Sequence, residues 1–400
     1  QEINNIPAHE KYAYQDGAFY VHEDGVLRTL DHAVLGNRTV PYDYVIPATV
    51  TRIESGAFNS SVYGTVTFMA GGDEDLVIAE AAFNNSSLSS IVLPARLREF
   101  EGTTSVSAEY NESFDGAFAY SKLETVIFED TDEEPSRLES IPNETFRFMA
   151  NLTGIEIPRN VKTIGFRAFT PSWNGTELAS ITLHEGLEEI GGYAFSDDFG
   201  DAEPMYTTLH IPSTVRYIGD YAFAFATSLT EIVFDKDEKG ECALEILGRS
   251  AFRFAAITEI TLPKSLAGSE YENDKPNGKL AGILFYGCRS LKTVVFEEGC
   301  PLITAYDGFV FASCDSYTDV TFPDNVTSIG QWEYDSLGTI KTITIPAGFD
   351  EESLTNIAPS LIGLNVGGFK LAEGNVHLYQ DGEEGAIYNL EKTRLIYYPN

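Results

Sequence analysis

Few side chains in the sequence stand at spacings that support catalysis. The chain has 6 histidines, and none forms an H-E-x-x-H pair or accompanies a G-x-S-x-G serine or a Gly-rich phosphate loop. Asp and Glu together number 61, so no single pair of carboxylates stands out as a general acid and base. The sequence therefore predicts no catalytic residues and no enzymatic activity.

One short polar segment carries carboxylates that could bind a cation. Asp197, Asp198 and Asp201 lie within residues 196–205, and calcium takes several oxygen ligands of this kind. Their spacing is not that of an EF-hand loop, so two hypotheses remain open: the carboxylates bind calcium, or they are simply solvated. No C-x-x-C motif occurs, which disfavours a structural zinc site. We expect no other metal and no cofactor.

Two of the 4 cysteines occupy matching places in the sequence. Cys288 and Cys314 each follow an aromatic residue by three positions, after Phe285 and Phe311. If these segments are equivalent coils of a repeat array, the two Cα atoms lie about 5 Å apart, which is close to the separation that a disulfide needs. A disulfide between them is one prediction, and a stack of two buried thiols is the other.

A recurring pattern along the chain must position all of these side chains. Residues 211–234 show it in full, with an Ile-Pro, a V-x-x-I-G run, an Ala-Phe pair and an L-x-x-I-x-F strand. A period in the twenties indicates a solenoid, whose coils must stack to bury their apolar residues. We expect the aromatic residue of each repeat to join one column in the core. These residues, mostly 23 to 29 positions apart, are Phe58, Phe83, Phe118, Phe146, Phe169, Phe195, Phe223, Phe252, Phe285, Phe311 and Tyr334.

Within each repeat the residue types predict a strand and the turns that bound it. Residues 178–183 alternate apolar and polar side chains, as in a half-buried strand. The Pro that follows the strand in many repeats, such as Pro212 or Pro263, removes a backbone donor and ends it. The Gly that ends each V-x-x-I-G run, such as Gly165, predicts a turn conformation that other residues resist.

The repeat resembles that of the BspA-like, or Treponema-type, leucine-rich repeat family. The shared pattern is V-x-x-I-G-x-x-A-F followed by L-x-x-I-x-L-P, and it covers residues 45–346. The resemblance implies a mainly β, right-handed leucine-rich-repeat solenoid of about eleven repeats of 23–29 residues, with short helical or irregular turns. A Pro stands where an ordinary leucine-rich repeat continues, so outer α-helices are not expected.

The array needs a cap at each end, because an open solenoid exposes strand edges. Residues 1–44 lack the repeat and carry Asp-Gly turns between short apolar segments, which predicts an N-terminal β-rich cap. Residues 45–346 form the predicted repeat domain. Residues 347–400 contain a degenerate last repeat and a segment that resembles the hairpin closing BspA-like arrays.

The charge of the chain excludes two classes of partner. With 61 acidic and 26 basic residues, the formal net charge is −35. Such a surface repels the phosphates of DNA and RNA and anionic lipid headgroups. No apolar run reaches the roughly 18 residues of a membrane-spanning helix, so we expect no nucleic-acid binding and no membrane insertion. We interpret the net negative charge in two ways: it keeps the protein soluble, or it binds a cationic partner or divalent ions.

The location of the protein is inferred from the family resemblance. Residues 1–4 show neither a basic segment nor an apolar core, so no export signal is visible. The resemblance implies an extracellular or cell-surface protein of a bacterium, and 9 N-x-S/T sequons leave a protist source open. We expect a monomer.

The outward positions of successive strands align into two rows. One row contains Ser90, Thr125, Gly154, Ser180, Thr208, Glu231, Glu259, Thr293, Asp319 and Thr342, and the other contains Val92, Ile127, Glu156, Thr182, His210, Val233, Thr261, Val295, Thr321 and Thr344. These residue types suit strands by β-propensity alone, but repeat proteins also bind partners on such extended surfaces. The candidate binding residues are Thr208, His210, Glu231, Glu259, Thr261 and Asp319.

The predicted function is therefore protein binding. The BspA-like resemblance implies an adhesin that contacts host matrix or other cells through the strand rows. The alternative is a carbohydrate-capture or scaffold component of the bacterial cell envelope. Sugar binding usually requires exposed aromatic residues, which the strand rows lack, although Trp173, Tyr206 and Trp332 in the loops keep this alternative open.

Overall fold

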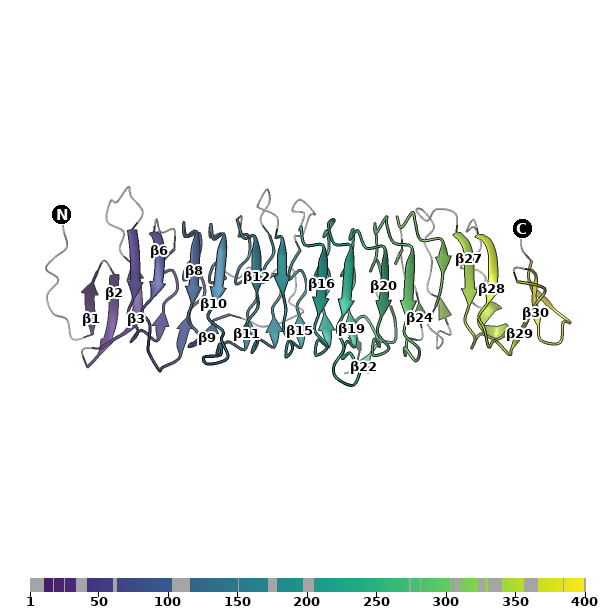
Figure 1. Ribbon diagram of the computed structural model, residues 1–400, viewed down its shortest axis with the longest axis horizontal. Helices are drawn as coiled ribbons and strands as arrows, with labels where there is room; N and C mark the ends of the chain where they lie inside the picture. The colour runs from purple at the N-terminus through teal and green to yellow at the C-terminus, as the bar shows by residue number, and fades with distance from the viewer. Residues whose placement is uncertain are drawn as a thin grey trace. The chain divides into compact units, whose positions relative to one another are not determined.

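The fold is described from a computed structural model, in which nearly every regular element is a strand and residues 351–355 form a helical turn. The chain divides into two compact units, Gln1–Glu203 and Pro204–Asn400, and Figure 1 shows their strands, some of them labelled. The described residues are 11–16, 18–24, 26–33, 42–59, 63–102, 116–149, 151–171, 178–196, 205–272, 275–280, 282–302, 304–305, 310–311, 313–322, 328–329, 340–355, 366–383 and 385–398.

In the first unit, the longer strands of the repeats pair in parallel and build one face. Ile91 and Leu93 are buried while Ser90 and Val92 are exposed, as the alternating pattern predicts. Four of these strands form one sheet and the last two form a separate pair. In chain order they are β4 (Tyr42–Ile46), β6 (Tyr63–Phe68), β8 (Ser90–Leu93), β10 (Thr125–Phe128), β12 (Gly154–Glu156) and β14 (Ser180–Thr182).

Shorter strands of the same repeats form a second set of parallel ladders. They come from the shorter apolar segment of each repeat, such as the V-x-x-I run of residues 161–164, and the Ile or Phe that ends each strand is buried. One ladder joins β5 (Arg52–Ile53), β7 (Leu76–Ile78) and β9 (Leu97–Phe100), and the other joins β11 (Ser140–Ile141), β13 (Thr163–Ile164) and β15 (Glu189–Ile190).

The first of these ladders continues into an antiparallel hairpin at its N-terminal edge. β1 (Tyr12–Gln15), β2 (Ala18–Glu23) and β3 (Val26–Ala33) pair antiparallel, and β3 then pairs in parallel with β5. The edge of this ladder is thereby covered, which is what a repeat protein needs at its end.

The second unit repeats the same two-strand coil. Its face strands are β16 (Thr208–Ile211), β18 (Glu231–Phe234), β20 (Glu259–Leu262), β23 (Thr293–Phe296), β25 (Asp319–Val320), β27 (Ile340–Ile345) and β28 (Val366–Leu371). Its shorter strands are β17 (Tyr217–Ile218), β19 (Ile246–Leu247), β24 (Thr304–Ala305) and β26 (Ser328–Ile329). Its antiparallel elements are the ribbon β21 (Tyr271–Glu272) and β22 (Lys275–Pro276), and the meander β29 (Leu378–Gln380), β30 (Ile387–Asn389) and β31 (Leu395–Tyr397).

A column of phenylalanine rings runs through the core of each unit. In the first unit the rings from Phe58 to Phe195 stack at centroid distances of 4.6, 4.7, 5.3, 5.1 and 5.3 Å. In the second unit the rings from Phe223 to Phe311 stack at 6.1, 6.4 and 5.6 Å. The predicted column is confirmed within each unit, and Tyr334 lies outside the described residues. The predicted fold class, a mainly β solenoid, is confirmed as well.

The glycines of the V-x-x-I-G runs serve a purpose that the sequence analysis did not predict. Gly165, Gly191 and Gly248 do not adopt a positive φ, so the turn conformation expected of them is wrong. A Cβ on Gly248 would lie 2.5 Å from the backbone N of Asp220 in the preceding coil, and a Cβ on Gly191 would lie 2.6 Å from the carbonyl carbon of Gly165. These glycines are needed because successive coils touch backbone to backbone.

Candidate functional site

The strand face of the second unit carries the candidate binding residues in the predicted register. Thr208 pairs with Glu231 across β16 and β18, and Glu259 pairs with Thr293 across β20 and β23. His210 and Thr261 occupy the second row on the same strands. Asp319 pairs with Thr342 further along the array. The six candidate side chains are all exposed.

A groove opens on this face where two neighbouring strands separate. Among the described residues, β16 pairs with β18 and β20 pairs with β23, but β18 and β20 share no ladder. The groove between them has a volume of about 410 Å³. Three of the predicted residues line it, namely Glu231, Glu259 and Thr261. We call this feature the acidic groove.

Apolar side chains and one ion pair complete the acidic groove. Its lining includes Phe234 and Pro263, together with Lys236 and Glu297. Lys236 Nζ lies 2.5 Å from Glu297 Oε1. Burial of the Glu297 carboxyl acts to raise its pKa, but the hydrogen bonds from Lys236 Nζ and the Lys264 N–H hold the pKa below its usual value. The hydrogen bond to Glu297 likewise raises the pKa of Lys236.

The two predicted carboxylates of the groove lack such partners. Within the described part of the chain, no Lys or Arg forms an ion pair with Glu231 or Glu259. Glu231 only accepts a hydrogen bond of 3.4 Å from Thr208 Oγ1. The groove therefore presents two uncompensated negative charges beside an apolar wall, an arrangement that suits a cationic side chain with a long aliphatic stem.

Three of the predicted residues, Thr208, His210 and Asp319, lie outside the acidic groove. His210 does not line it, and its Nδ1 lies 3.1 Å from Asp235 Oδ1 on the surface. Asp319 is positioned on a different strand, where Thr318 Oγ1 donates to it at 2.9 Å. Lys236, Glu297 and the apolar wall were missed, because a gap between two strands leaves no signature in a repeat pattern.

The cysteines adopt the stacked-thiol arrangement and not the disulfide. Cys242, Cys288 and Cys314 are free thiols, and all four cysteines are buried. Cys288 Sγ donates to the Phe252 carbonyl at 3.2 Å, and Cys314 Sγ donates to the Phe285 carbonyl at 3.0 Å. Burial raises the pKa of the Cys314 thiol to about 12 and also raises that of Cys288. Such thiols are structural, since the nucleophilic form of cysteine is the thiolate.

Other predicted ligands lie outside the described residues or in the core. Asp197, Asp198 and Asp201, the possible calcium ligands, are outside the described residues, as are Trp173 and Trp332. Tyr206 is 2% exposed, and burial raises the pKa of its phenol. The expectation that Tyr206 could serve as a loop platform for sugars is therefore wrong. In the described ranges, no group of three His, Cys, Asp or Glu side chains is arranged to hold a metal ion.

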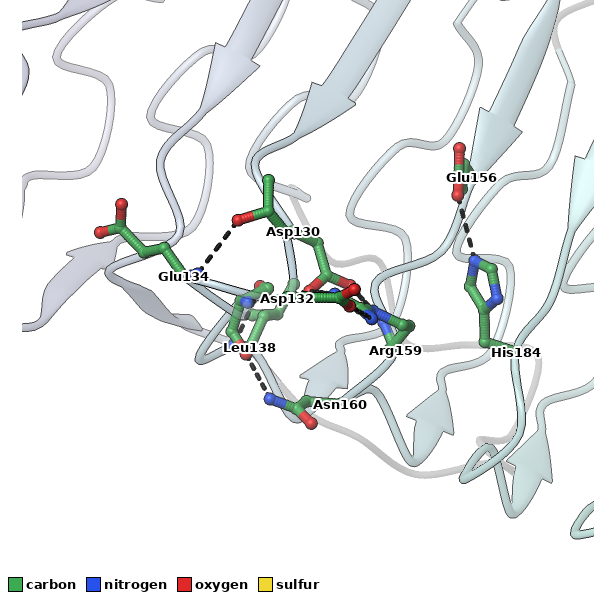
Figure 2. A network of polar contacts seen from close by, with 10 residues as sticks. Asp130, Asp132, Glu134, Leu138, Glu156, Arg159, Asn160 and His184 are labelled. Atoms are coloured by element: carbon green, nitrogen blue, oxygen red, sulfur yellow. Dashed lines mark hydrogen bonds and ion pairs between the residues drawn. The ribbon is translucent and has the colours of Figure 1, made fainter.

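Two carboxylates of an acidic loop in the first unit pair with an arginine from the next coil. Figure 2 shows Arg159 reaching Asp130 and Asp132, with His184 and Glu156 paired nearby. The Arg159 N–H also donates to Asp130 at 2.7 Å. Burial acts to raise the pKa of Asp130, but the N–H groups of Arg159 and Ser136 and the guanidinium lower it below its ordinary value. Asp130 is thus already fully engaged as a structural carboxylate.

We expect replacement of Arg159 with Ala to change how stability depends on pH. A carboxylate whose folded pKa is depressed stabilises the fold above its unfolded pKa, about 3.9 for Asp, and this contribution is lost as the pH falls through the folded pKa. The stability difference between the wild type and R159A should therefore be full at pH 7 and shrink below about pH 4. Urea unfolding at pH 7, 5, 4 and 3 measures it. Lys162→Ala, which removes an exposed charge from the same unit, is the control, and a difference as large at pH 3 as at pH 7 would contradict the assignment.

No helix among the described residues is long and apolar enough to cross a membrane.

A family model described as the BspA type leucine rich repeat region matches the chain in 6 copies, over residues 42–134, 100–200, 199–272 and 279–359. No curated protein matches the sequence.

Several solved structures are similar to this chain at low sequence identity. A leucine-rich repeat protein from Bacteroides ovatus is 17% identical, with 92% of this chain and 100% of that chain covered and a TM-score of 0.45. A leucine rich cell surface protein from Faecalibacterium prausnitzii is 17% identical, with 92% and 96% covered and a TM-score of 0.38. The pneumococcal vaccine antigen PcpA is 17% identical, with 91% and 94% covered and a TM-score of 0.40.

Proposed function

Because the chain belongs to the BspA-type leucine-rich repeat family, we propose that it is a non-enzymatic protein-binding module that holds its partner on the strand face. Proteins of this family and fold are typically not enzymes. The finer proposal is an adhesin at the cell surface or outside the cell, where the BspA-like resemblance associates such arrays with attachment to host matrix or other cells.

The acidic groove is the observation that supports this proposal most directly. Glu231 and Glu259 lie on strands β18 and β20 without ion-pair partners among the described residues, and Phe234 and Pro263 line the same groove. A Lys or Arg of the partner could place its stem against the apolar wall and its charge between the two carboxylates. The partner is therefore proposed to present a basic segment on its surface.

The extended strand face gives the partner more than one point of contact. Strands of neighbouring coils lie about 4.8 Å apart, so residues of the same row recur at a spacing that an extended protein surface can match. Asp319 adds a third exposed carboxylate to the row. Charge complementarity of this kind raises the association rate and fixes the register of a complex.

The test is charge reversal on the face, with a matched reversal elsewhere. Surface-plasmon binding to a panel of matrix proteins, mucins and glycans, with and without calcium, identifies a saturable protein hit for the wild-type chain. We expect E231K/E259K/D319K to weaken that binding about tenfold or more, because each carboxylate loses a charge-assisted contact and gains a repulsive one. The control is E238K/E272K/E383K, which changes the net charge equally at exposed positions off the row.

Comparison of the strand-face variant with the control variant tests the proposed binding site. Loss of binding in the strand-face variant alone supports the proposal. Equal loss in both variants would show that binding depends on the net charge of the chain and not on the strand face. Unchanged binding in the strand-face variant overturns the acidic-groove assignment.

A further inference from the structure

Three aromatic rings and an arginine form a cluster on the turns of the second unit. The rings of Phe225 and Phe254 stack at 5.3 Å, and Tyr286 meets Phe254 edge-on at 5.4 Å. The guanidinium carbon of Arg253 lies 5.5, 5.0 and 4.7 Å from the centroids of Phe225, Phe254 and Tyr286. All four side chains are half-buried. We call them the Arg253 cluster.

The repeat geometry brings these residues together from three successive coils. Phe225 and Phe254 each stand two positions after a core-column phenylalanine and have φ values of 62° and 60°. In the next coil the equivalent residue is Gly287, on which a Cβ would lie 2.2 Å from the Phe254 ring. Gly287 therefore allows the Phe254 ring to lie against the following coil. These turns lie between the short strands and the face strands, outside the acidic groove.

A comparison within the chain shows what the Arg253 cluster lacks. Arg147 occupies the equivalent position in the first unit, 4.2 Å from the Phe148 ring, and its Nη1 pairs with Glu144 at 2.8 Å. Glu144 precedes its column phenylalanine by two residues, and the corresponding residue before Phe252 is Ser250. Both have φ of 57°, so the backbone conformation at this position is the same, but the carboxylate is missing.

The cation of the Arg253 cluster is consequently not neutralised. Within the described ranges, Arg253 forms no ion pair and its side chain makes no hydrogen bond. Its Nε is buried without a partner, and so is the hydroxyl of Ser250, a residue that is 0% exposed. A guanidinium that lies against aromatic rings keeps its in-plane N–H groups available for a carboxylate.

We propose that the Arg253 cluster binds a sugar that carries a single carboxylate, such as the terminal acidic residue of a glycan. The carboxylate accepts hydrogen bonds from Arg253, which lacks the internal partner that Glu144 gives Arg147, and the sugar ring packs on the neighbouring aromatic side chains. A chain with a net charge of −35 repels polyanions such as acidic peptides over a long range. A single carboxylate experiences less of this repulsion. The proposal is independent of the acidic groove, which lies on the strand face.

The experiment titrates the full chain with N-acetylneuraminic acid and with glucuronic acid, and uses N-acetylglucosamine as the neutral sugar. Calorimetry or saturation-transfer NMR measures the affinity. We expect the acidic sugars to bind more tightly than the neutral one and R253A to lose about tenfold or more of the affinity, the value of a hydrogen-bonded charge. R147A is the matched control, since Arg147 is already paired with Glu144, and should bind as the wild type does.

A second variant keeps the test decisive if R253A loosens the turn. S250E places a carboxylate at the position of Glu144, and this internal partner should displace the sugar while circular dichroism and the melting temperature report an intact fold. Binding of acidic sugars to R253A or S250E at wild-type affinity overturns the proposal. Equal affinity for N-acetylglucosamine, absence of any sugar binding, or tighter binding of a tetraglutamate peptide would overturn it as well.

Discussion

Replacing Phe118 with Ala should lower the free energy of unfolding by about 3–5 kcal/mol. The side chain is 0% exposed, and its ring stacks on Phe83 at 4.7 Å and on Phe146 at 5.3 Å. Phe100 also meets it edge-on at 6.0 Å. Removal of an interior ring leaves a cavity that neighbouring coils cannot close, because their backbones are fixed by the strand ladders on either side.

Urea unfolding of the full chain, followed by circular dichroism, measures this loss. Tyr120→Ala is the matched control, because Tyr120 lies in the same turn but is 50% exposed. We expect the control to cost about 1 kcal/mol or less, as surface substitutions do. Equal costs for F118A and Y120A would show that the column does not hold the coils together.

Replacing Gly248 with Ala should destabilise the second unit by about 3 kcal/mol, the upper range for overpacking. The added Cβ would lie 2.5 Å from the backbone N of Asp220 and from the carbonyl carbon of Gly219. Real Cβ atoms do not approach backbone atoms so closely, so the two coils must separate. Separation at this point strains the neighbouring ladder between β17 and β19.

The control for this prediction is Gly240→Ala, in the same unit. Gly240 has a φ of 78°, and a Cβ there would meet nothing within 4 Å. Its cost is conformational alone, about 1 kcal/mol. Thermal and urea unfolding of both variants compare the two effects. A smaller loss for G248A than for G240A would contradict the backbone-contact explanation.

The sequence predicted the parts of the fold that repeat. Phe83 and Phe118 recur at the same place in their coils, so periodicity alone was enough to predict their stacking. The register of Thr208 with Glu231 followed in the same way, because equivalent residues of adjacent coils must pair. The exposure of the candidate strand residues followed from the alternation of the strand.

The remaining features depend on distances between coils, which residue types do not encode. The acidic groove lies between β18 and β20, which share no ladder, and Lys236 and Glu297 line it. The sequences of these two repeats nevertheless follow the same pattern as the others. The place of Tyr206 in the core was missed because it follows a polar loop. By contrast, the exchange of Glu144 for Ser250 is visible once the repeats are aligned.

The measurement that most directly tests protein binding on the strand face is hydrogen–deuterium exchange of the chain with and without the tightest-binding protein of the panel. We expect protection of the backbone amides to concentrate at residues 230–236 and 258–263, which line the acidic groove. Protection confined to the turns that carry Phe225, Phe254 and Tyr286, or to residues 1–203, would contradict the proposal that the partner binds on the strand face of the second unit.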